Sequence, residues 1–534
     1  MPYFTIQVRP FWLGLVGVFL LLGIVQGVME ARAQETDLTQ TPNAENAGIQ
    51  KSLAEQIGPG RGDQDTPGSS KYLIARDPFR SIRRGRNLFQ RKFTVEQGFG
   101  PRTGDGSGDI VAEGSIGAGL ADSCAACHGR PRGSAGFGGD VFTRPDSRDA
   151  PHLFGLGLVE MLADEITKDL RRIRAEATAK AQSTGSSVRR ELSSKGIRYG
   201  HITVNPDGSV DPSHIQGVNE DLRVRPFFHE GETISIREFV VGALNAEMGL
   251  EAFDPDLAQA ATGGKIVTPA GMELDGSLDR IEAPPATSES DDPDVDGVAN
   301  EIPVSLVDHF EFYLLNYFKP AVGRQTFNSQ RGRQLFERIR CTGCHIPSLM
   351  IEQDRRVADV ETLYDARRGV FNRLFATATP LFQELPDSGV PSIKQPKGEP
   401  FVVKNIFADF KRHDLGPNFW ERNFDGSLTK EFMTEPLWGV GTTGPYGHDG
   451  RSINLWSVIM RHGGEAQGAR DRFARLSNNQ QGQILDFLES LVLFPPDDTA
   501  SNLNPGDPQA QNYPQYGHGN IALPKLFNDP NELE

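Results

Sequence analysis

Cysteine is scarce in this chain, because only four are present among 534 residues. Cations are also outnumbered: 55 Lys and Arg face 71 Asp and Glu, which gives a formal net charge of −16 at pH 7. This balance argues against a nucleic-acid partner and against an anionic membrane surface. An apolar stretch at residues 11–25 is short for a membrane-spanning helix, which needs about 20 residues. The length leaves room for two or more domains.

The N-terminus is typical of an export signal. Arg9 gives it a positive start, residues 11–25 form its apolar part, and Ala31-Arg32-Ala33 fits a small-x-small cleavage site. We therefore expect a signal peptide over residues 1–33, a mature chain that starts at Gln34, and a periplasmic location. An uncleaved N-terminal anchor is the alternative.

All four cysteines lie in two copies of the C-x-x-C-H pattern, Cys124-Ala-Ala-Cys127-His128 and Cys341-Thr-Gly-Cys344-His345. In c-type haem attachment, two thiols add to the vinyl groups of one haem and the histidine ligates its iron. A zinc site or a redox dithiol would use the cysteines without requiring either histidine. The pattern predicts two covalently bound haem c groups and no structural disulfide. Export fits this prediction, because such attachment occurs outside the bacterial cytoplasm.

The chain contains a diverged repeat, marked by four short landmarks in the same order in each half. They are residues 85–89, 124–128, 151–157 and 229–234 in the first half, and residues 332–336, 341–345, 436–441 and 448–453 in the second. Spacings between landmarks differ, which indicates large inserted loops. We infer two related haem domains.

We predict a mainly α fold with two tandem cytochrome-c-like haem domains and large loop and helical insertions. The expected order is a flexible segment (34–80), an N-terminal domain (81–303), a C-terminal domain (304–497) and an extended tail (498–534). Apolar residues at helical spacing predict helices at residues 234–248, 304–318, 453–461 and 480–493. Residues 158–190 should form a charged helical insertion, and each Gly-Arg-x-Leu-Phe segment should begin a short helix.

The sixth position of each iron decides between electron transfer and the binding of peroxide or oxygen. His462 follows a helical stretch and precedes Gly463-Gly464, which would let the backbone approach a flat macrocycle. We predict that His462 is the distal ligand of the second haem; the alternative is a helix-capping role. The matching residue in the first half is Ala243, which cannot ligate iron. The repeat thus predicts a bis-histidine second haem and an open first haem.

Peroxide activation at the first haem needs a base that moves a proton between the two oxygens. Glu247 lies one helical turn beyond Ala243 and is our candidate, although an exposed helix carboxylate is the commoner role for such a residue. His229 and His152 are secondary candidates. The repeat pairs His229 with His448, which favours a structural hydrogen bond in both halves, with a haem propionate as one acceptor.

These motifs together resemble the bacterial di-haem cytochrome c peroxidase superfamily, and more closely its branch named di-haem oxidoreductase, putative peroxidase. The resembling segments run from about residue 85 to 493: DSCAACHGRPRG, APHLFGLGLVE, GALNAEMG, RGRQLFERIRCTGCHIP, RHDLGP, EPLWGVG, GPYGHDGRSINLW and RHGGEAQGARDRFARLS. The resemblance implies that the second haem passes electrons to a peroxide-binding first haem. It also implies a Glu-Met pair near the first haem, matched by Glu247-Met248, and a distal ligand where His462 stands, usually a methionine.

Two residues depart from the family pattern. His229 stands where the family has a tryptophan between the haems, and Phe239 stands where peroxidases have a distal glutamine. Trp438 is an alternative inter-haem aromatic, or else a buried core residue. Related rubber-cleaving oxygenases use a bis-histidine second haem, and an apolar Phe239 would suit oxygen chemistry.

The resemblance also implies calcium between the domains, with Thr443 and Pro445 matching part of that site. Separately, Asp292, Asp294 and Asp296 alternate before Gly297 as in a calcium loop, although Pro303 stands where its twelfth residue should be glutamate. A solvated acidic loop is the alternative. We therefore predict calcium as a further cofactor.

Our leading functional hypothesis is a periplasmic peroxidase that reduces hydrogen peroxide with electrons from a small donor protein, a cytochrome c or a cupredoxin. The acidic net charge would suit a basic donor. The second hypothesis is a di-haem electron carrier, which would require His152 or His229 to reach the first iron. The third is an oxygenase for a large substrate, with insertions 158–225 and 250–300 forming the cleft.

Overall fold

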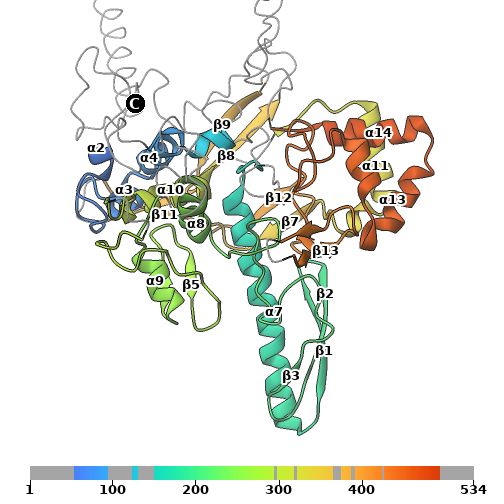
Figure 1. Cartoon of the computed structure of the whole chain (residues 1–534), viewed down its shortest axis with the longest axis horizontal. Helices are drawn as coiled ribbons and strands as arrows, with labels where there is room; N and C mark the ends of the chain where they lie inside the picture. The colour runs from blue at the N-terminus through green and yellow to red at the C-terminus, as the bar shows by residue number, and fades with distance from the viewer. Residues whose placement is uncertain are drawn as a thin grey trace, which may run out of the picture. The chain divides into compact units, whose positions relative to one another are not determined.

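The computed structural model describes residues 53–93, 123–129, 150–293, 297–317, 321–364, 374–386, 391–423 and 426–493. Helices form the interior of both halves of this part of the chain (Figure 1). They are α2 (Leu53–Ile57), α3 (Ser70–Arg76), α4 (Pro78–Gln90), α6 (Cys124–His128), α7 (Leu156–Thr184), α8 (Ile236–Met248), α9 (Pro255–Ala261), α10 (Val304–Asn316), α11 (Phe327–Arg338), α12 (Leu455–Arg461), α13 (Gln467–Ala474) and α14 (Asn478–Glu489). Among the described residues, no helix is both long enough and apolar enough to cross a membrane.

The same helix crossing occurs once in each half. α4 packs against α10, and α11 packs against α14. Gly85 and Gly332, from the first landmark, lie at these crossings. A Cβ atom on Gly85 would lie 2.3 Å from the carbonyl oxygen of His309, and one on Gly332 would lie 1.8 Å from that of Gln483. The landmark therefore marks a close helix contact. It does not begin a helix as expected, since α4 starts at Pro78 and α11 at Phe327.

The third and fourth landmarks also occupy matching places. Added Cβ atoms on Gly157 and Gly441 would meet backbone at the ends of α10 and α14, 2.1 Å from the oxygen of Leu315 and 2.4 Å from that of Glu489. A single β-bridge closes each fourth landmark, Phe227 with Thr233 and Tyr446 with Ser452. Ser235 and Asn454 then cap α8 and α12. These pairs give the sequence repeat a structural counterpart.

Gly332→Ala should lower the free energy of unfolding by roughly 3 kcal/mol, because the added methyl group overpacks the α11–α14 crossing. Gly482→Ala is the matched control on α14: nothing lies within 4 Å of its Cβ position. That variant should gain up to about 1 kcal/mol from helix propensity. Urea unfolding of the haem-loaded protein, followed by far-UV circular dichroism, checks both. Equal midpoints for the two variants would show that the crossing tolerates a side chain.

A long arm extends from the first half. It consists of α7 and a sheet of β1 (Val188–Ser194), β2 (Ile197–Val204) and β3 (Val210–Asp211), which lie side by side in Figure 1. The helical insertion was predicted to reach Arg190, but α7 ends at Thr184, because Gly185 adopts a left-handed conformation. Arg190 lies in β1 instead.

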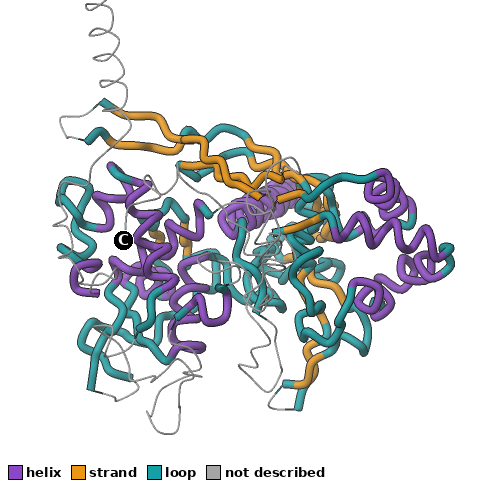
Figure 2. The backbone as a smooth tube through the Cα atoms, turned by 90° about the horizontal axis from the view of Figure 1, so that it is seen from above, coloured by secondary structure: helices purple, strands orange, loops and turns teal. Residues whose placement is uncertain are grey.

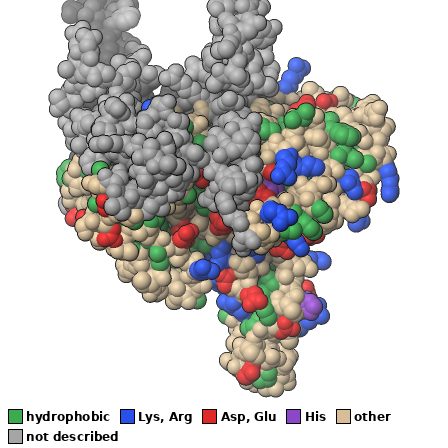
Figure 3. All heavy atoms as spheres, viewed as in Figure 1, with side chains coloured by type: hydrophobic (Ala, Val, Ile, Leu, Met, Phe, Trp, Pro, Cys, Tyr) green, Lys and Arg blue, Asp and Glu red, His purple; other side chains and the backbone are tan. Residues whose placement is uncertain are grey.

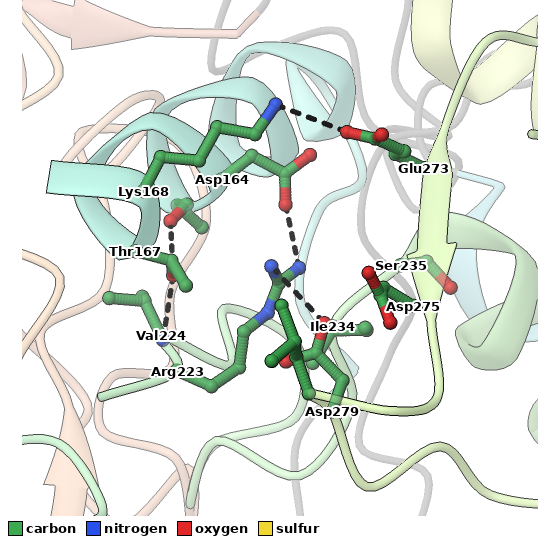
Figure 4. Close-up of polar contacts among 12 residues, drawn as sticks. Asp164, Thr167, Lys168, Arg223, Val224, Ile234, Ser235, Glu273, Asp275 and Asp279 are labelled. Atoms are coloured by element: carbon green, nitrogen blue, oxygen red, sulfur yellow. Dashed lines mark hydrogen bonds and ion pairs between the residues drawn. The ribbon is translucent and has the colours of Figure 1, made fainter. Parts of the chain in front are cut away.

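Buried polar contacts fix the base of this arm (Figure 4). Arg223 donates to Asp164 of α7 at 2.6 Å and lies 3.7 Å from Asp279. The backbone N–H of Val224 donates to the Thr167 hydroxyl at 3.0 Å. Charge-assisted hydrogen bonds between buried groups are strong and directional. These contacts therefore fix the orientation of the arm relative to the first half.

Strand content exceeds the prediction of a mainly α fold. Small antiparallel ribbons run across the molecule between the helices (Figure 2). Besides the arm, the strands are β4 (Lys265–Val267), β5 (Glu273–Asp275), β6 (Ala321–Val322), β7 (Ser348–Ile351), β8 (Ala358–Tyr364), β9 (Leu374–Pro380), β10 (Phe382–Leu385), β11 (Ile393–Pro396), β12 (Phe401–Lys404), β13 (Arg412–Asp414), β14 (Glu421–Arg422), β15 (Leu428–Thr429), β16 (Glu431–Met433) and β17 (Leu491–Val492). They pair as β4–β5, β6–β17, β7–β12, β8–β9, β10–β11, β13–β16 and β14–β15.

The predicted domain boundaries differ from the packing. α10 was expected in the second domain, but it packs against α3, α4 and α8 of the first half. Arg237 of α8 reinforces this contact with buried ion pairs to Asp308 (3.0 Å) and Glu311 (2.8 Å) of α10. Part of the segment expected to be flexible is ordered, since α2 and α3 lie within residues 53–80 and bury Leu53 and Leu73. The last predicted helix ends at Glu489, and β17 follows.

Candidate functional site

The second C-x-x-C-H motif forms a short 3-10 turn over Cys341–Gly343, directly after α11. The His345 ring lies below it, 6.0 Å from the ring of Phe336. Its Nδ1 lies 3.0 Å from the carbonyl oxygen of Phe407. A carbonyl oxygen only accepts, so Nδ1 carries the proton and Nε2 keeps its lone pair. This is the arrangement that orients a metal-ligating histidine.

His462 has the same arrangement at the end of α12. Its Nδ1 donates to the carbonyl oxygen of Val458 at 2.7 Å, so its Nε2 also keeps a lone pair. Burial, with a smaller effect of the nearby His345, lowers the pKa of His462 to about 4. The ring is therefore neutral at pH 7, which is the form that binds a metal.

The two glycines after His462 lie against the chain at the end of β13. Gly463 donates its N–H to the carbonyl oxygen of Leu415 at 2.9 Å. A Cβ atom on Gly464 would lie 2.1 Å from the carbonyl oxygen of Asp414. These glycines therefore allow a close approach to the chain after β13.

A cavity of ≈ 550 Å³ joins these groups. Its walls include both cysteines of the second motif, His345 and His462, with apolar side chains between them. The apolar lining residues of this part are Phe336, Leu415, Phe419, Leu455, Val458, Ile459 and Leu488. Two thiols, two imidazoles with free Nε2 atoms and an apolar cavity are what a covalently bound haem with two histidine ligands needs. The residues present therefore fit the predicted second haem.

His413 is a residue of this site to which the sequence analysis assigned no role. Its Nε2 lies 2.9 Å from the Asp409 carboxylate and its Nδ1 lies 2.8 Å from the Glu465 carboxylate. Burial opposes the charge, but hydrogen bonds to Asp409 and to the Cys344 sulfur raise the pKa of His413 to about 11. Covalent haem attachment, as the motif predicts, would turn that sulfur into a thioether and leave Asp409 and Glu465 as the partners of His413. The RHDLGP segment was the available signal.

The first motif forms the short helix α6, which Ser123 caps by accepting from the N–H of Ala126. His128 Nδ1 donates to the carbonyl oxygen of Pro151 at 2.7 Å, as His345 does to that of Phe407. Burial lowers the pKa of His128 to about 4. The described part of this site is α6, α8 and residues 150–157, because residues 94–122 and 130–149 lie outside the described residues.

Glu247 lies near this first motif. Burial and then the charge of Glu247 raise the pKa of the Cys127 thiol to about 11, which indicates that the carboxylate is close to this sulfur. Counted from their caps, Ala243 and His462 hold the same position, eight residues after Ser235 and Asn454. α12 ends at Arg461, whereas α8 continues to Met248 and so carries Glu247. Phe239 lies one turn before Ala243 and contacts the rings of Phe227 and Phe228.

The fourth-landmark histidines meet between the two motifs. The ring centroids of His229 and His448 are 5.8 Å apart. His229 Nδ1 lies 3.0 Å from the Glu435 carboxylate, and His448 Nε2 lies 3.0 Å from that of Glu421. His448 also stacks on Phe432 at 3.9 Å and lines the cavity. The symmetric structural role predicted for this pair therefore has a carboxylate partner in each half.

A chain of hydrogen bonds connects the two motif histidines through the backbone between them. Its central link is His152, whose Nε2 donates to the carbonyl oxygen of Trp438 at 2.8 Å. From donor to acceptor, the bonds are His128 to the carbonyl of Pro151 (2.7 Å), His152 to that of Trp438 (2.8 Å), Leu437 to that of Ile406 (3.0 Å) and His345 to that of Phe407 (3.0 Å). Trp438 is buried and lines the cavity, so it is both a core residue and a neighbour of the second site.

The predicted calcium residues are described in part. Asp292 accepts from the N–H of Gly297 at 3.0 Å, which closes the loop, but Asp294 and Asp296 lie outside the described residues. Thr443 and Pro445 line the large cavity. Calcium therefore stays a prediction.

One segment of the chain matches a family model. Residues 387–491 match the family described as "Di-haem oxidoreductase, putative peroxidase". This segment contains His448 and His462, and the match confirms the resemblance found in the sequence. The chain is also similar to a hydrazine synthase chain from Kuenenia stuttgartiensis, with 15% identity and a TM-score of 0.27, over 85% of this chain and 99% of that one. So weak a likeness carries no argument. No curated protein matches the chain.

Proposed function

We propose that this protein is a periplasmic di-haem c-type oxidoreductase that reduces hydrogen peroxide at its N-terminal haem. Electrons reach that haem through the C-terminal one, which His345 and His462 hold. One observation carries the proposal: equivalent positions of the repeat hold His462 in one half and Ala243 in the other. One half therefore offers a second imidazole, whereas the other offers a methyl group followed by a carboxylate.

The division of roles follows from these side chains. A c-type haem supplies an iron that exchanges electrons, and it binds peroxide where no sixth protein ligand competes. His345 and His462 offer two neutral imidazoles at the second site, which suits electron transfer. At the first site His128 offers one imidazole, and Glu247 is placed to accept and return the peroxide proton. His413, held by two carboxylates, keeps a positive charge beside the second motif.

The rival electron-carrier hypothesis needs His152 or His229 on the first iron. His152 Nε2 donates to the carbonyl oxygen of Trp438, and His229 Nδ1 contacts the Glu435 carboxylate, so either histidine would have to ligate through its other ring nitrogen. Export follows from the signal over residues 1–33, and covalent haem attachment agrees with it. A small cytochrome c or cupredoxin is the proposed donor.

Low-temperature EPR of the purified ferric protein, together with peroxide consumption, tests the function. We expect one high-spin and one low-spin haem, and peroxide loss driven by a chemical reductant. The assay is run on the oxidised and the half-reduced protein, because reduction of the second haem can be needed to open the first. Two low-spin haems with no peroxide consumption in either state would overturn the proposal.

A further inference from the structure

Three arginines line the wall of the large cavity beside the second motif: Arg340, Arg470 and Arg472. Arg340 immediately precedes Cys341 and is exposed. Arg472 lies near enough to Cys341 to lower the pKa of that thiol against the effect of burial. Positive charge therefore gathers where the second haem is attached to the chain. We call Arg340, Arg470 and Arg472 the arginine rim.

Nearby carboxylates compensate this charge only in part. Arg470 donates to Asp471 at 2.7 Å, and Arg472 donates to the carbonyl oxygen of Ile339 at 2.8 Å. Glu465 also lines the cavity, but it is bound to His413. Exposed Arg475, three residues after Arg472 at the end of α13, is counted with the arginine rim from here on. Exposed Arg338 and exposed Glu337 adjoin the rim along the chain. Figure 3 shows Lys and Arg side chains spread over the surface of the C-terminal half.

The local charge has the opposite sign to the charge of the chain, which is −16. Charges farther away than about 10 Å are largely screened at 0.1 M salt, so docking depends on the groups around the contact. Complementary charges orient an encounter and speed association. The net charge of the chain would suit a basic donor, whereas the arginines at this face favour an acidic one.

We propose that the arginine rim is the docking surface for a small electron-transfer protein that presents an acidic face. This inference rests on the proposed function, because it names the partner of the second haem. The electron leaves the donor's metal centre, which is oxidised, and the haem iron held by His345 and His462 is reduced. Arg340 and Arg475 are the side chains best placed to meet carboxylates, since both are exposed and neither guanidinium group has a hydrogen bond or ion pair with another described residue.

The sign of the electrostatic potential at the arginine rim can be tested by stopped-flow reduction of the second haem with two small reductants. One is dithionite, which is anionic, and the other is hexaammineruthenium(II), which is cationic. We expect the rate constant with dithionite to fall as ionic strength rises, and the rate constant with the ruthenium complex to increase. A site governed by the net charge of the chain would give the opposite two slopes, and that result would overturn the proposal.

The variant Arg340→Gln/Arg475→Gln should lower the dithionite rate constant at low salt by roughly fivefold, a modest steering effect. The control Arg189→Gln/Arg190→Gln removes the same charge from exposed β1 and should leave the rate constant unchanged. Polyglutamate, a redox-inert acidic chain, should slow dithionite in the parent protein and not in the rim variant.

Another role for these arginines would be to bind the carboxylates of the porphyrin. In that case the rim variant would change the haem content or the midpoint potential and leave the salt dependence as in the parent, which would overturn the proposal. All these measurements follow reduction of the second haem without peroxide. A protein that fails to reduce peroxide could therefore still show the expected slopes, and failure of the two proposals can be told apart.

Discussion

Glu247→Gln should reduce peroxide turnover by about two orders of magnitude or more, because general acid–base catalysis contributes roughly 10²–10⁴-fold. Glutamine keeps the size of the side chain but cannot accept and return a proton. The peroxide concentration at half-maximal rate should change little, since the iron and not the carboxylate binds the oxygen. Steady-state peroxide consumption at saturating reductant measures both quantities.

Two companions sharpen this test. Glu247→Asp retains a carboxylate on a shorter side chain and should recover part of the lost turnover. Gly242→Ala changes the same helix where nothing lies within 4 Å of the added Cβ, so its turnover should match that of the parent. The EPR spectra of all three variants should remain those of the parent. Parent-like turnover in Glu247→Gln would remove this residue from the mechanism.

Features that a short stretch of sequence specifies were predictable. The C-x-x-C-H motifs define their own chemistry, and their spacing allows one turn of chain in each case. The helices at α8 and α12 carry apolar residues at helical spacing and have polar caps, Ser235 and Asn454, directly before them. The repeat could be aligned because each landmark has the same structural role in both halves. For example, Gly85 and Gly332 each allow two helices to cross closely.

Features that depend on distant partners were not predictable. Apart from β8 and β9, the ribbon strands have two to four residues, which is too short to show a reliable alternation of apolar and polar residues. α10 reads as an apolar-faced helix, but nothing in its own sequence says that it packs on α4 and not on the helices that follow it. The position of the domain boundary was lost for the same reason.

In the candidate site too, locally specified features were predictable and features that depend on distant residues were not. The candidate histidines could be predicted from the sequence, because they adjoin motifs or occupy matched positions. The groups that orient them could not, since the acceptors are backbone carbonyls of Pro151, Phe407 and Val458. Every residue has such a carbonyl, so no residue type marks it. The arginine rim was missed because Arg340 follows α11 and Arg472 lies on α13, far apart in the sequence, so the two come together only in the fold.

His462→Ala should convert the second haem from low-spin to high-spin, because the variant removes the second imidazole and leaves the cavity apolar. EPR of the ferric protein would then show two high-spin haems, and added imidazole should restore the low-spin signal by entering the space that the side chain left. His214→Ala, on the exposed arm, is the matched histidine control and should leave the spectrum unchanged. An unchanged low-spin signal in His462→Ala would mean that another group ligates this iron.

His462→Met separates ligation from folding. Methionine can ligate iron through its thioether, and a His/Met pair raises the reduction potential relative to two histidines. This variant should therefore keep a low-spin second haem at a higher potential, as measured by a redox titration of its visible spectrum. A higher potential weakens the driving force for passing an electron to the first haem, so peroxide turnover should fall although Glu247 and the first site are untouched. Loss of turnover with the first haem still high-spin would place His462 in the electron route.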